Sequence, residues 1–341
     1  MREKMKKKLL SKNAVTLYLL AAVYGAVSYL LYSGAASRQM SSMLISVSCY
    51  IVMAVSLNLV VGLLGELSLG HAGFMSVGLF SGCLVSIALA EALPMALRLP
   101  LSMLVGGVAA SLVGLLVGLP ALRLRGDYLA IVTLACGEII KNIITNLGFT
   151  GGALGLNTNP IYSGPKALLP YAVVLVFLTV LVMMNLKNSR QGRAIMAIRD
   201  NRIAAESNGV NVTAYKLMVF VLAAFFAGAA GALYGHSFAN VKAASFDYNM
   251  SIEILVIVVL GGMGSIRGSV IAAILLKALP ELLRVGNIAN YRMLVYSVLL
   301  ILIMLLNASP KFARMRGRWS PAALLGLLRK RTPETAVQEG E

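Results

Sequence analysis

Apolar segments separated by short polar intervals follow one another along nearly the whole chain. Many of them hold roughly 20 residues, about the length at which an α-helix crosses the hydrocarbon core of a bilayer. The pattern predicts an all-α polytopic membrane protein with about ten transmembrane helices, some of them broken or re-entrant. The expected crossings are residues 14–32, 41–63, 74–93, 101–122, 128–144, 168–186 and 217–236, two halves of an apolar stretch interrupted at 261–268, and residues 293–306.

The first apolar segment also has features of a signal peptide, because it follows a basic stretch and precedes a run of small residues at 34–37. The hydrophobic region of a signal peptide usually has about 7 to 15 residues, and this one is longer. We therefore expect a retained first crossing. The chain then divides into a basic cytoplasmic tail at residues 1–13, a transmembrane domain at 14–308, and a basic and then disordered cytoplasmic tail at 309–341.

The composition supports this class, since 59% of the residues are hydrophobic and 13% are charged. A soluble domain has about 45 to 50% apolar and about 25% charged residues. Ten crossings with a cytoplasmic N-terminus put 22 of the 30 Lys and Arg residues on the cytoplasmic side, where positive charge accumulates. Both termini are therefore expected in the cytoplasm. Orientation and anionic lipid account for the net charge of +17, so nucleic acid is not an expected partner.

Metal, nucleotide and enzyme sites are not indicated. Cys49, Cys83 and Cys136 lie in apolar segments without metal-ligand spacing, and we expect them to pack as small hydrophobic residues. The glycine-rich interval 260–268 lacks the lysine and the spacing of a phosphate-binding loop. The two histidines and the scattered carboxylates form no convergent catalytic group.

The polar interval 187–216 carries six cations against two acidic residues, which favours a cytoplasmic position. We expect a short helix from Asn201 to Asn208, capped by Asp200 and ended by Gly209 in the left-handed conformation. Such a helix is too short to cross a bilayer. It can lie across the cytoplasmic face and offer Ile203, Ala204 and Val210 to another protein.

Three polar or glycine-rich intervals interrupt the apolar segments, at 57–74, 120–134 and 260–268. The first indicates a broken helix whose backbone is buried in protein or faces a cavity. The second is expected to be a tight cytoplasmic turn fixed by Arg123 and Arg125, and the third separates two apolar halves. In the second interval Asp127 is the expected cap of the following helix. Beyond it, Glu138 either lines a transport pathway or makes a structural hydrogen bond, because an intramembrane carboxylate must face the bundle interior. His71 is more simply a packing residue than a ligand.

These intervals together resemble the LivM-type permease subunits of branched-chain amino acid ABC importers. The resemblance covers about residues 41–308. The strings that carry it are LNLVVGLLGELSLGHAGF at 57–74, LRLRGDYLAIVTLACGEII at 122–140, TGGALGL at 150–156, GRAIMAIRDNRIAAESNGVN at 192–211, FVLAAFFAGAAGALYG at 220–235 and VIVVLGGMGSIRGSVIAA at 256–273. The coupling loop of that family often reads Ala-Ala-Glu-Ala-Met-Gly, where this chain has Ala-Ala-Glu-Ser-Asn-Gly at 204–209.

The resemblance implies a multi-pass permease of the bacterial inner membrane. Its implied partners are a second homologous permease, two cytoplasmic ATPase subunits that hold ATP and Mg²⁺, an extracytoplasmic substrate-binding protein and membrane lipid, with no cofactor in this chain. Movement of the ATPases would reach the membrane through the loop 187–216, by way of Arg193, Arg199, Asp200, Ala204, Ala205, Glu206 and Gly209. Polar groups along the substrate pathway would be Asn58, Ser68, His71, Thr133 and Glu138.

Other functions remain open at this point. Relatives that carry urea, short amides or other amino acids would share the scaffold. An ion-coupled secondary transporter would need its own coupling-ion site, such as paired intramembrane carboxylates. Only Glu138 and Glu253 lie clearly within spans, and they are on distant segments.

Overall fold

The computed structural model describes residues 24–25, 38–124, 126–282, 294, 297–298, 301–302 and 305. The chain divides into two units, residues 1–281 and 282–341, and the architecture below is that of the first. The expected crossings at 14–32 and 293–306 and both tails lie largely or wholly outside the described residues. The main helices are α2 (Arg38–Asn58), α3 (His71–Ala88), α4 (Met95–Ala121), α5 (Asp127–Asn146), α6 (Pro165–Asn188), α7 (Arg190–Asp200), α8 (Arg202–Ser207), α9 (Val212–Gly235), α10 (Tyr248–Gly261) and α11 (Ile266–Leu282).

Seven segments of the described chain are long and apolar enough to cross a membrane. They are Ser41–Leu64, His71–Ala88, Met95–Ala121, Asp127–Asn146, Pro165–Asn188, Val212–Gly235 and Ala243–Gly261. Each overlaps one of the expected crossings, although several boundaries differ by three to six residues. The all-α polytopic fold is thus confirmed.

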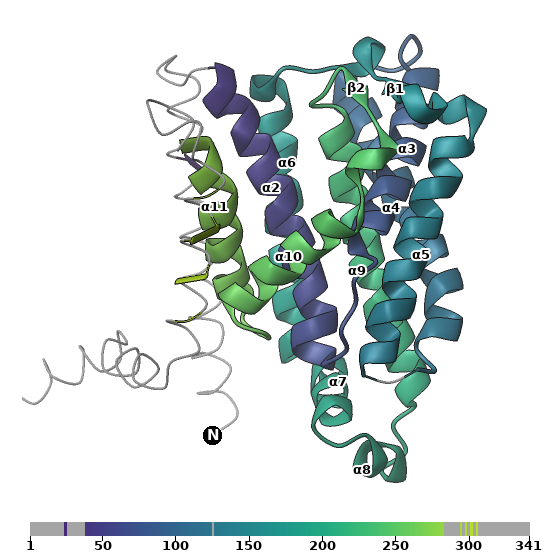
Figure 1. Cartoon of the computed structure of the whole chain (residues 1–341), viewed down its shortest axis with the longest axis vertical. Coiled ribbons are helices and arrows are strands. Elements are labelled where there is room, and N and C mark those ends of the chain that lie inside the picture. The colour runs from purple at the N-terminus through teal and green to yellow at the C-terminus, as the bar shows by residue number, and fades with distance from the viewer. Residues whose placement is uncertain are drawn as a thin grey trace, which may run out of the picture. The chain divides into compact units, whose positions relative to one another are not determined.

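The centre of the bundle is built from α3, α4 and α9, which Figure 1 shows side by side. Small residues allow this approach. A side chain at Gly78 would run into the backbone of Gly228, and one at Gly228 would meet Gly106 and Ala110. Helices in lipid often associate through such small residues, because these let the backbones come close and gain van der Waals contact. The small residues of α9 therefore lie in the contacts with α3 and α4.

The first predicted break is present between α2 and α3. After α2 the chain forms a π-helical segment, η1 (Leu59–Leu64), which ends at Gly65 in the left-handed conformation with φ +80°. Residues 65–70 then run without helix to His71, where α3 starts. Figure 1 shows this link rising from the lower end of the bundle toward α3. We call residues 65–70 the inner strap.

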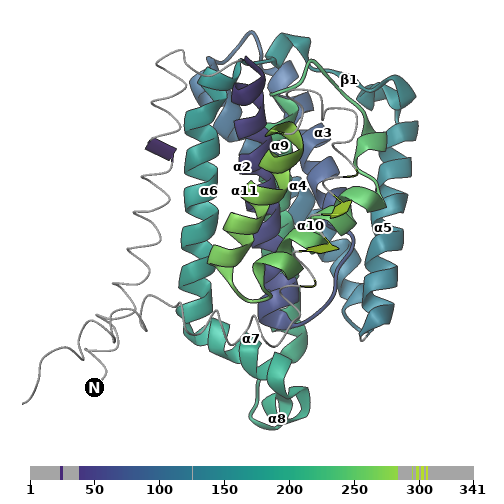
Figure 2. The ribbon, with the colours of Figure 1, turned by 60° about the vertical axis from the view of Figure 1, so that its left-hand side comes forward.

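The second region of broken helix lies between α10 and α11. A tight turn at 262–265 contains Gly262 (φ +91°) and Gly264 (φ +79°), which take backbone conformations that favour glycine. The turn folds α11 back along α10, and Figure 2 shows the two helices beside α2. The interruption expected at 261–268 is confirmed.

Two ends of the bundle can be distinguished by their contacts. The outer end holds the loop after α5, the loop after α9, and a pair of two-residue strands, β1 (Leu156–Asn157) and β2 (Asn240–Val241), which are antiparallel. Single 3₁₀ turns complete it, at η2 (Gly148–Thr150), η3 (Gly152–Leu154), η4 (Asn159–Ile161) and η5 (Ala243–Ser245). The inner end holds η1, the turn 262–265, and α7 and α8, which lie at the bottom of Figure 1.

A neutral histidine closes the outer end of α9. The Nδ1 of His236 lies 2.8 Å from the carbonyl oxygen of Ala232, and its Nε2 lies 2.8 Å from Ser86 Oγ. Because the carbonyl can only accept, Nδ1 carries the proton and the Ser86 hydroxyl donates to Nε2. Burial lowers the pKa of His236, so the imidazole stays uncharged.

One predicted cap is wrong. Asp127 was expected to cap α5, but it is the first helical residue, and the cap position is Gly126 with φ +58° and ψ −133°. This backbone conformation is one that glycine adopts readily and that aspartate does not. Asp127 still stands in the first turn, where a negative charge is favourable. Its neighbour Arg125 lies outside the described residues.

Candidate functional site

The predicted coupling loop, residues 187–216, contains two helices rather than one. Ser189 caps α7 by accepting a hydrogen bond from Gly192 N at 3.0 Å. Asn201 caps α8 by accepting from Ala204 N at 3.1 Å. Gly209 ends this stretch with φ +76°, as expected. The sequence interpretation missed α7, although its serine cap and its apolar spacing could have indicated it.

The predicted cap Asp200 is a second correction. Asp200 is the last residue of α7, and its carboxylate accepts from Arg199 at 3.0 Å. Both Asp200 and Asn201 have side chains that can cap a helix. Only Asn201 has the extended backbone that a cap needs, with φ −156° and ψ 104°. The backbone of the turn between α7 and α8 therefore determines that Asn201, and not Asp200, caps α8.

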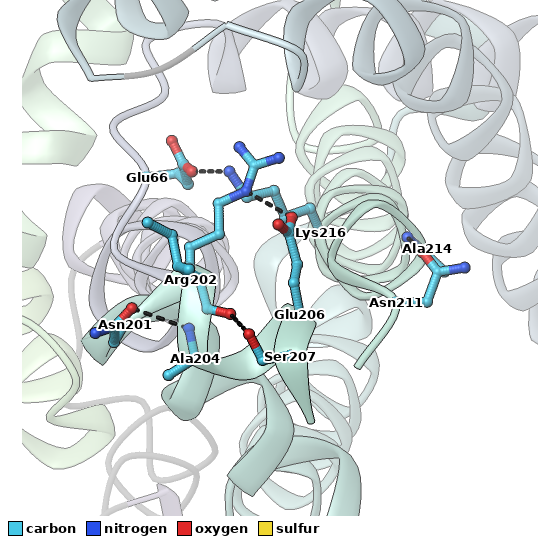
Figure 3. A network of polar contacts seen from close by, with 10 residues as sticks. Glu66, Asn201, Arg202, Ala204, Glu206, Ser207, Asn211, Ala214 and Lys216 are labelled. Atoms are coloured by element: carbon cyan, nitrogen blue, oxygen red, sulfur yellow. Dashed lines mark hydrogen bonds and ion pairs between the residues drawn. The ribbon is translucent and has the colours of Figure 1, made fainter. Parts of the chain in front are cut away.

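The surface of α8 is largely open to solvent. Ile203 is 77% exposed, and Ala204 and Glu206 are also exposed. Of the apolar residues expected on this surface, Val210 is half-buried, and Ala205, expected to take part in coupling, is buried against the rest of the chain. Figure 3 shows Arg202 paired with Glu206, at 2.9 Å. This pair is exposed and contributes little to stability, so the surface is free to meet another protein.

The coupling loop is tied to the broken helices by three basic residues. Lys216, near the start of α9, forms an ion pair with Glu66 in the inner strap, which Figure 3 shows. Arg199 Nη1 donates to the carbonyl oxygen of Gly62 in η1 at 3.1 Å. Lys187 Nζ donates to the carbonyl oxygen of Gly264. The last carbonyl groups of a helix have no partner within it; Arg199 satisfies one of them at the end of η1, and Lys187 satisfies a carbonyl of the turn 262–265.

Among the candidate pathway residues, those near the first break are buried. His71 Nε2 lies 2.8 Å from Ser56 Oγ. Thr133 Oγ1 on α5 accepts from Leu69 N at 3.0 Å, which ties α5 to the inner strap. Ser68 Oγ is buried without a hydrogen-bond partner among the described residues. The structure thus gives His71 a polar partner inside the bundle, as a packing residue has.

Asn58 serves the second break rather than the first. Its Oδ1 accepts from Gly264 N at 2.7 Å, and its Nδ2 donates to Ser269 Oγ at 2.8 Å. Both contacts cross from α2 to the turn 262–265 and α11. Asn58 therefore holds two distant broken segments together, and a small cavity lies beside it between the inner ends of α2 and α6 and this turn.

Glu138 stands at the start of α10. Its Oε1 accepts from Tyr248 N at 2.9 Å, and Oε2 is paired with Lys141 on the next turn of α5. The carboxylate therefore meets one of the free N–H groups at the beginning of a helix, where a negative charge is favourable. The structural hydrogen bond considered from the sequence is present. The Glu138 side chain is also 27% exposed, so a role along a pathway remains compatible with it.

A charged group that the site prediction omitted lies on α2, α10 and α11. Glu253 and Lys277 form an ion pair at 2.7 Å. The Lys277 ammonium stands 3.5 Å from the centre of the Tyr50 ring, whose hydroxyl donates to Glu253 at 3.4 Å. Opposite charges on two consecutive apolar segments were the signal that could have revealed this pair. No group of three metal-ligating side chains occurs in the part of the chain that the structure describes.

Comparison with known proteins gives these features a context. The permease component family of the branched-chain amino acid transport system matches residues 39–304. This chain belongs to that family. The match includes α2 through α11, and therefore both broken regions and the coupling loop.

Two bacterial members are 34% identical to this chain. They are the high-affinity branched-chain amino acid transport system permease proteins LivM of Salmonella typhimurium and Escherichia coli, with 86% and 85% of this chain and 70% of each relative covered. A probable LivM of Methanocaldococcus jannaschii is 28% identical over 51% of this chain and 55% of its own length. No solved structure gives a significant match. The chain is a multi-pass permease subunit of an ABC importer of branched-chain amino acids in the bacterial inner membrane.

Proposed function

We propose that this permease works in a complex with a second homologous permease, two cytoplasmic ATPase subunits and an extracytoplasmic substrate-binding protein. ATP and Mg²⁺ are held by the ATPases, and this chain needs no cofactor of its own. The loop 187–216 docks on an ATPase and carries its movement into the membrane. The observation that supports this most is the placement of α8: its surface is exposed, and the helices on either side of it contact η1 and the inner strap through Arg199 and Lys216.

The proposed topology has ten crossings with both termini in the cytoplasm. The contacts of the described spans support it, since the segments at 62–66, 187–216 and 262–265 meet at the inner end. The loops at 156–163 and 236–241 meet at the outer end. Ser207→Cys should therefore resist an impermeant thiol reagent applied to intact cells, and Asn157→Cys should react. Labelling at position 207 would contradict the topology.

The proposed pathway follows the broken helices and carries a zwitterion past mostly apolar walls. Aliphatic side chains of the substrate suit such walls, and the few polar groups can satisfy its ammonium and carboxylate. Two intramembrane pairs offer both signs of charge, Glu138 with Lys141 and Glu253 with Lys277. Charged residues inside a membrane are rare and usually mark such pathways. Asn58, His71 and Thr133 hold the broken segments through hydrogen bonds, and Ser68 is a further buried polar group of the pathway.

The docking role of α8 can be tested by co-purification of the ATPase with the permease in detergent. Ile203→Asp places a charge on the most exposed apolar residue of α8, and Glu206→Lys reverses a charge beside it. Both should reduce recovery of the ATPase and uptake of branched-chain amino acids while the permease still reaches the membrane. Leu154→Asp is the matched control, because Leu154 is 82% exposed at the outer end and its replacement should not affect ATPase binding.

Full ATPase binding and full uptake in both α8 variants would contradict this proposal. The ATPase would then dock on a part of this chain other than α8.

A further inference from the structure

The links between the coupling loop and the spans reach the inner strap and the end of η1 before it. The Lys216 and Glu66 side chains are 5% and 13% exposed, so their ion pair is well shielded from water. Arg199 holds the carbonyl oxygen of Gly62. Its aliphatic stem also covers Gly65, where a side chain would lie 2.6 Å from Arg199 Cγ. Two of the three links of the 187–216 loop, those of Arg199 and Lys216, therefore act on one short stretch of chain, residues 62–66.

The inner strap leads from these contacts directly to the start of α3. Leu69 N donates to Thr133 Oγ1 at 3.0 Å, and Ala72 N, in the first turn of α3, donates to Ser251 Oγ on α10 at 3.2 Å. Backbone hydrogen bonds join the ends of the strap to the adjoining helices, from Glu66 N to Val60 O at 3.2 Å and from Gly73 N to Gly70 O at 3.0 Å. The residues between are not helical, and six residues of extended chain span at most about 20 Å.

The strap is tightly packed, and Ser68 within it is 1% exposed. Neighbouring glycines at 65 and 70 have no room for a side chain, which keeps the strap tightly fitted in the present arrangement.

We propose that the inner strap passes movement of the coupling loop to the start of α3, with the Glu66–Lys216 ion pair and the Arg199–Gly62 hydrogen bond as its two links. The inference rests on the proposed function, since the movement begins with an ATPase docked on α8. Glu66, Lys216 and Arg199 are positioning residues in this scheme. Movement of α3 and α10 at Ala72 and Ser251 would then alter the pathway, by rearrangement of packed elements between discrete positions.

The test is the coupling ratio, measured as amino acid taken up per ATP hydrolysed by the full complex in liposomes. E66Q/K216M removes both charges of the link without leaving either one unpaired. The expected result is a complex that assembles and hydrolyses ATP, with the coupling ratio reduced about tenfold, near the middle of the range for mutations between coupled sites. The charge-swapped variant E66K/K216E should restore most of the ratio.

The matched control is S86A/H236Q. Ser86 and His236 join α3 and α9 at the outer end, with a separation of 150 residues along the chain, equal to that of Glu66 and Lys216. A loss of stability alone would lower uptake and hydrolysis together in either variant. Only loss of the link lowers the ratio, so S86A/H236Q should keep the ratio of the unmodified protein.

An unchanged coupling ratio in E66Q/K216M would overturn the inference. If that variant does not assemble, Arg199→Gln decides, with Arg98→Gln as its control, because Arg98 also donates to a backbone carbonyl but at the outer end. Arg199→Gln with an unchanged ratio would equally overturn it. Failure of the proposed function would look different, because the α8 variants Ile203→Asp and Glu206→Lys would then keep full ATPase binding.

Discussion

Helices α3 and α9 run parallel, from the inner end to the outer end, and they are joined near both ends by contacts of different chemistry. The inner clasp is the Glu66–Lys216 ion pair, and the outer clasp is the hydrogen bond between Ser86 and His236. The outer clasp joins one helix to the residue that ends the other. The inner clasp joins α9 to the inner strap, which precedes α3 and is not helical.

This difference indicates which end of the bundle is fixed. The outer clasp is neutral, and the chain around His236 is held by backbone hydrogen bonds, from Ser163 N to His236 O at 3.1 Å and through the nearby β1–β2 pair. The inner clasp is charged. It lies beside the end of η1, where Arg199 donates to the carbonyl oxygen of Gly62. An ion pair shielded from water is sensitive to any change in its geometry, since separation leaves two charges poorly solvated. We therefore expect the outer end of the bundle to stay fixed and the inner end to move when the coupling loop moves.

The largest effect is expected from disrupting the packing of α3 against α9, the two helices that both clasps join. Gly78→Val puts a side chain into the backbone of Gly228 and should prevent α3 and α9 from associating. Folded permease recovered from membranes in detergent, measured by size-exclusion chromatography, should fall to background. Gly164→Ala is the control, because no atom lies within 4 Å of the added methyl group, and its yield should be normal.

Removing one partner should lower the free energy of unfolding more at the inner clasp than at the outer clasp. Glu66→Gln leaves the Lys216 charge buried without its counter-ion, and we expect a loss of about 3 to 5 kcal/mol of unfolding free energy. Ser86→Ala leaves a neutral acceptor on His236 unpaired, which should cost about 1 to 3 kcal/mol. Reversible unfolding in detergent measures both. Equal losses of unfolding free energy in the two variants would contradict this difference between the clasps.

A smaller loss of unfolding free energy is expected from substitution of Gly209, which lies between α8 and α9. Gly209 has φ +76° and open space around it, so a substitution is limited by backbone conformation alone. Gly209→Val should cost about 1 to 2 kcal/mol, because a left-handed conformation is strained for a residue with a side chain. The same unfolding measurement applies. Gly209→Asn should be tolerated better, since asparagine enters this region more readily.

The smallest effect concerns Glu138, which contacts the start of α10. Glu138→Gln keeps the shape of the side chain that accepts from Tyr248 N but removes the charge next to Lys141. Uptake should fall by roughly tenfold, which corresponds to about 1.4 kcal/mol, while assembly with the ATPase is retained. Loss of assembly instead of transport would assign Glu138 a purely structural role.

Apolar length and charge were sufficient to predict the seven spans of the described chain, the two broken regions and the exposed helix that precedes Gly209. These features depend on local chemistry that the sequence displays directly. The partners of the charged residues could not be predicted, because Lys216 meets Glu66 and Lys277 meets Glu253 only after the helices pack. The cap of α8 was placed one residue too early for a similar reason. Asp200 and Asn201 have comparable side chains, and the turn set by α7 selects between them.

The basic residues of the inner end have a further consequence for how this protein reaches its final orientation. In the proposed topology, Lys187 and Arg199 act as orientation signals during insertion, because their charge disfavours translocation of the loop that contains them. After folding, the same two side chains donate to backbone carbonyl oxygens of the two broken regions, Gly264 in the turn 262–265 and Gly62 near the end of η1. Neutralising either residue therefore weakens the orientation signal and removes a hydrogen bond from a broken region in a single step, so the orientation and the fold of the inner end depend on the same side chains.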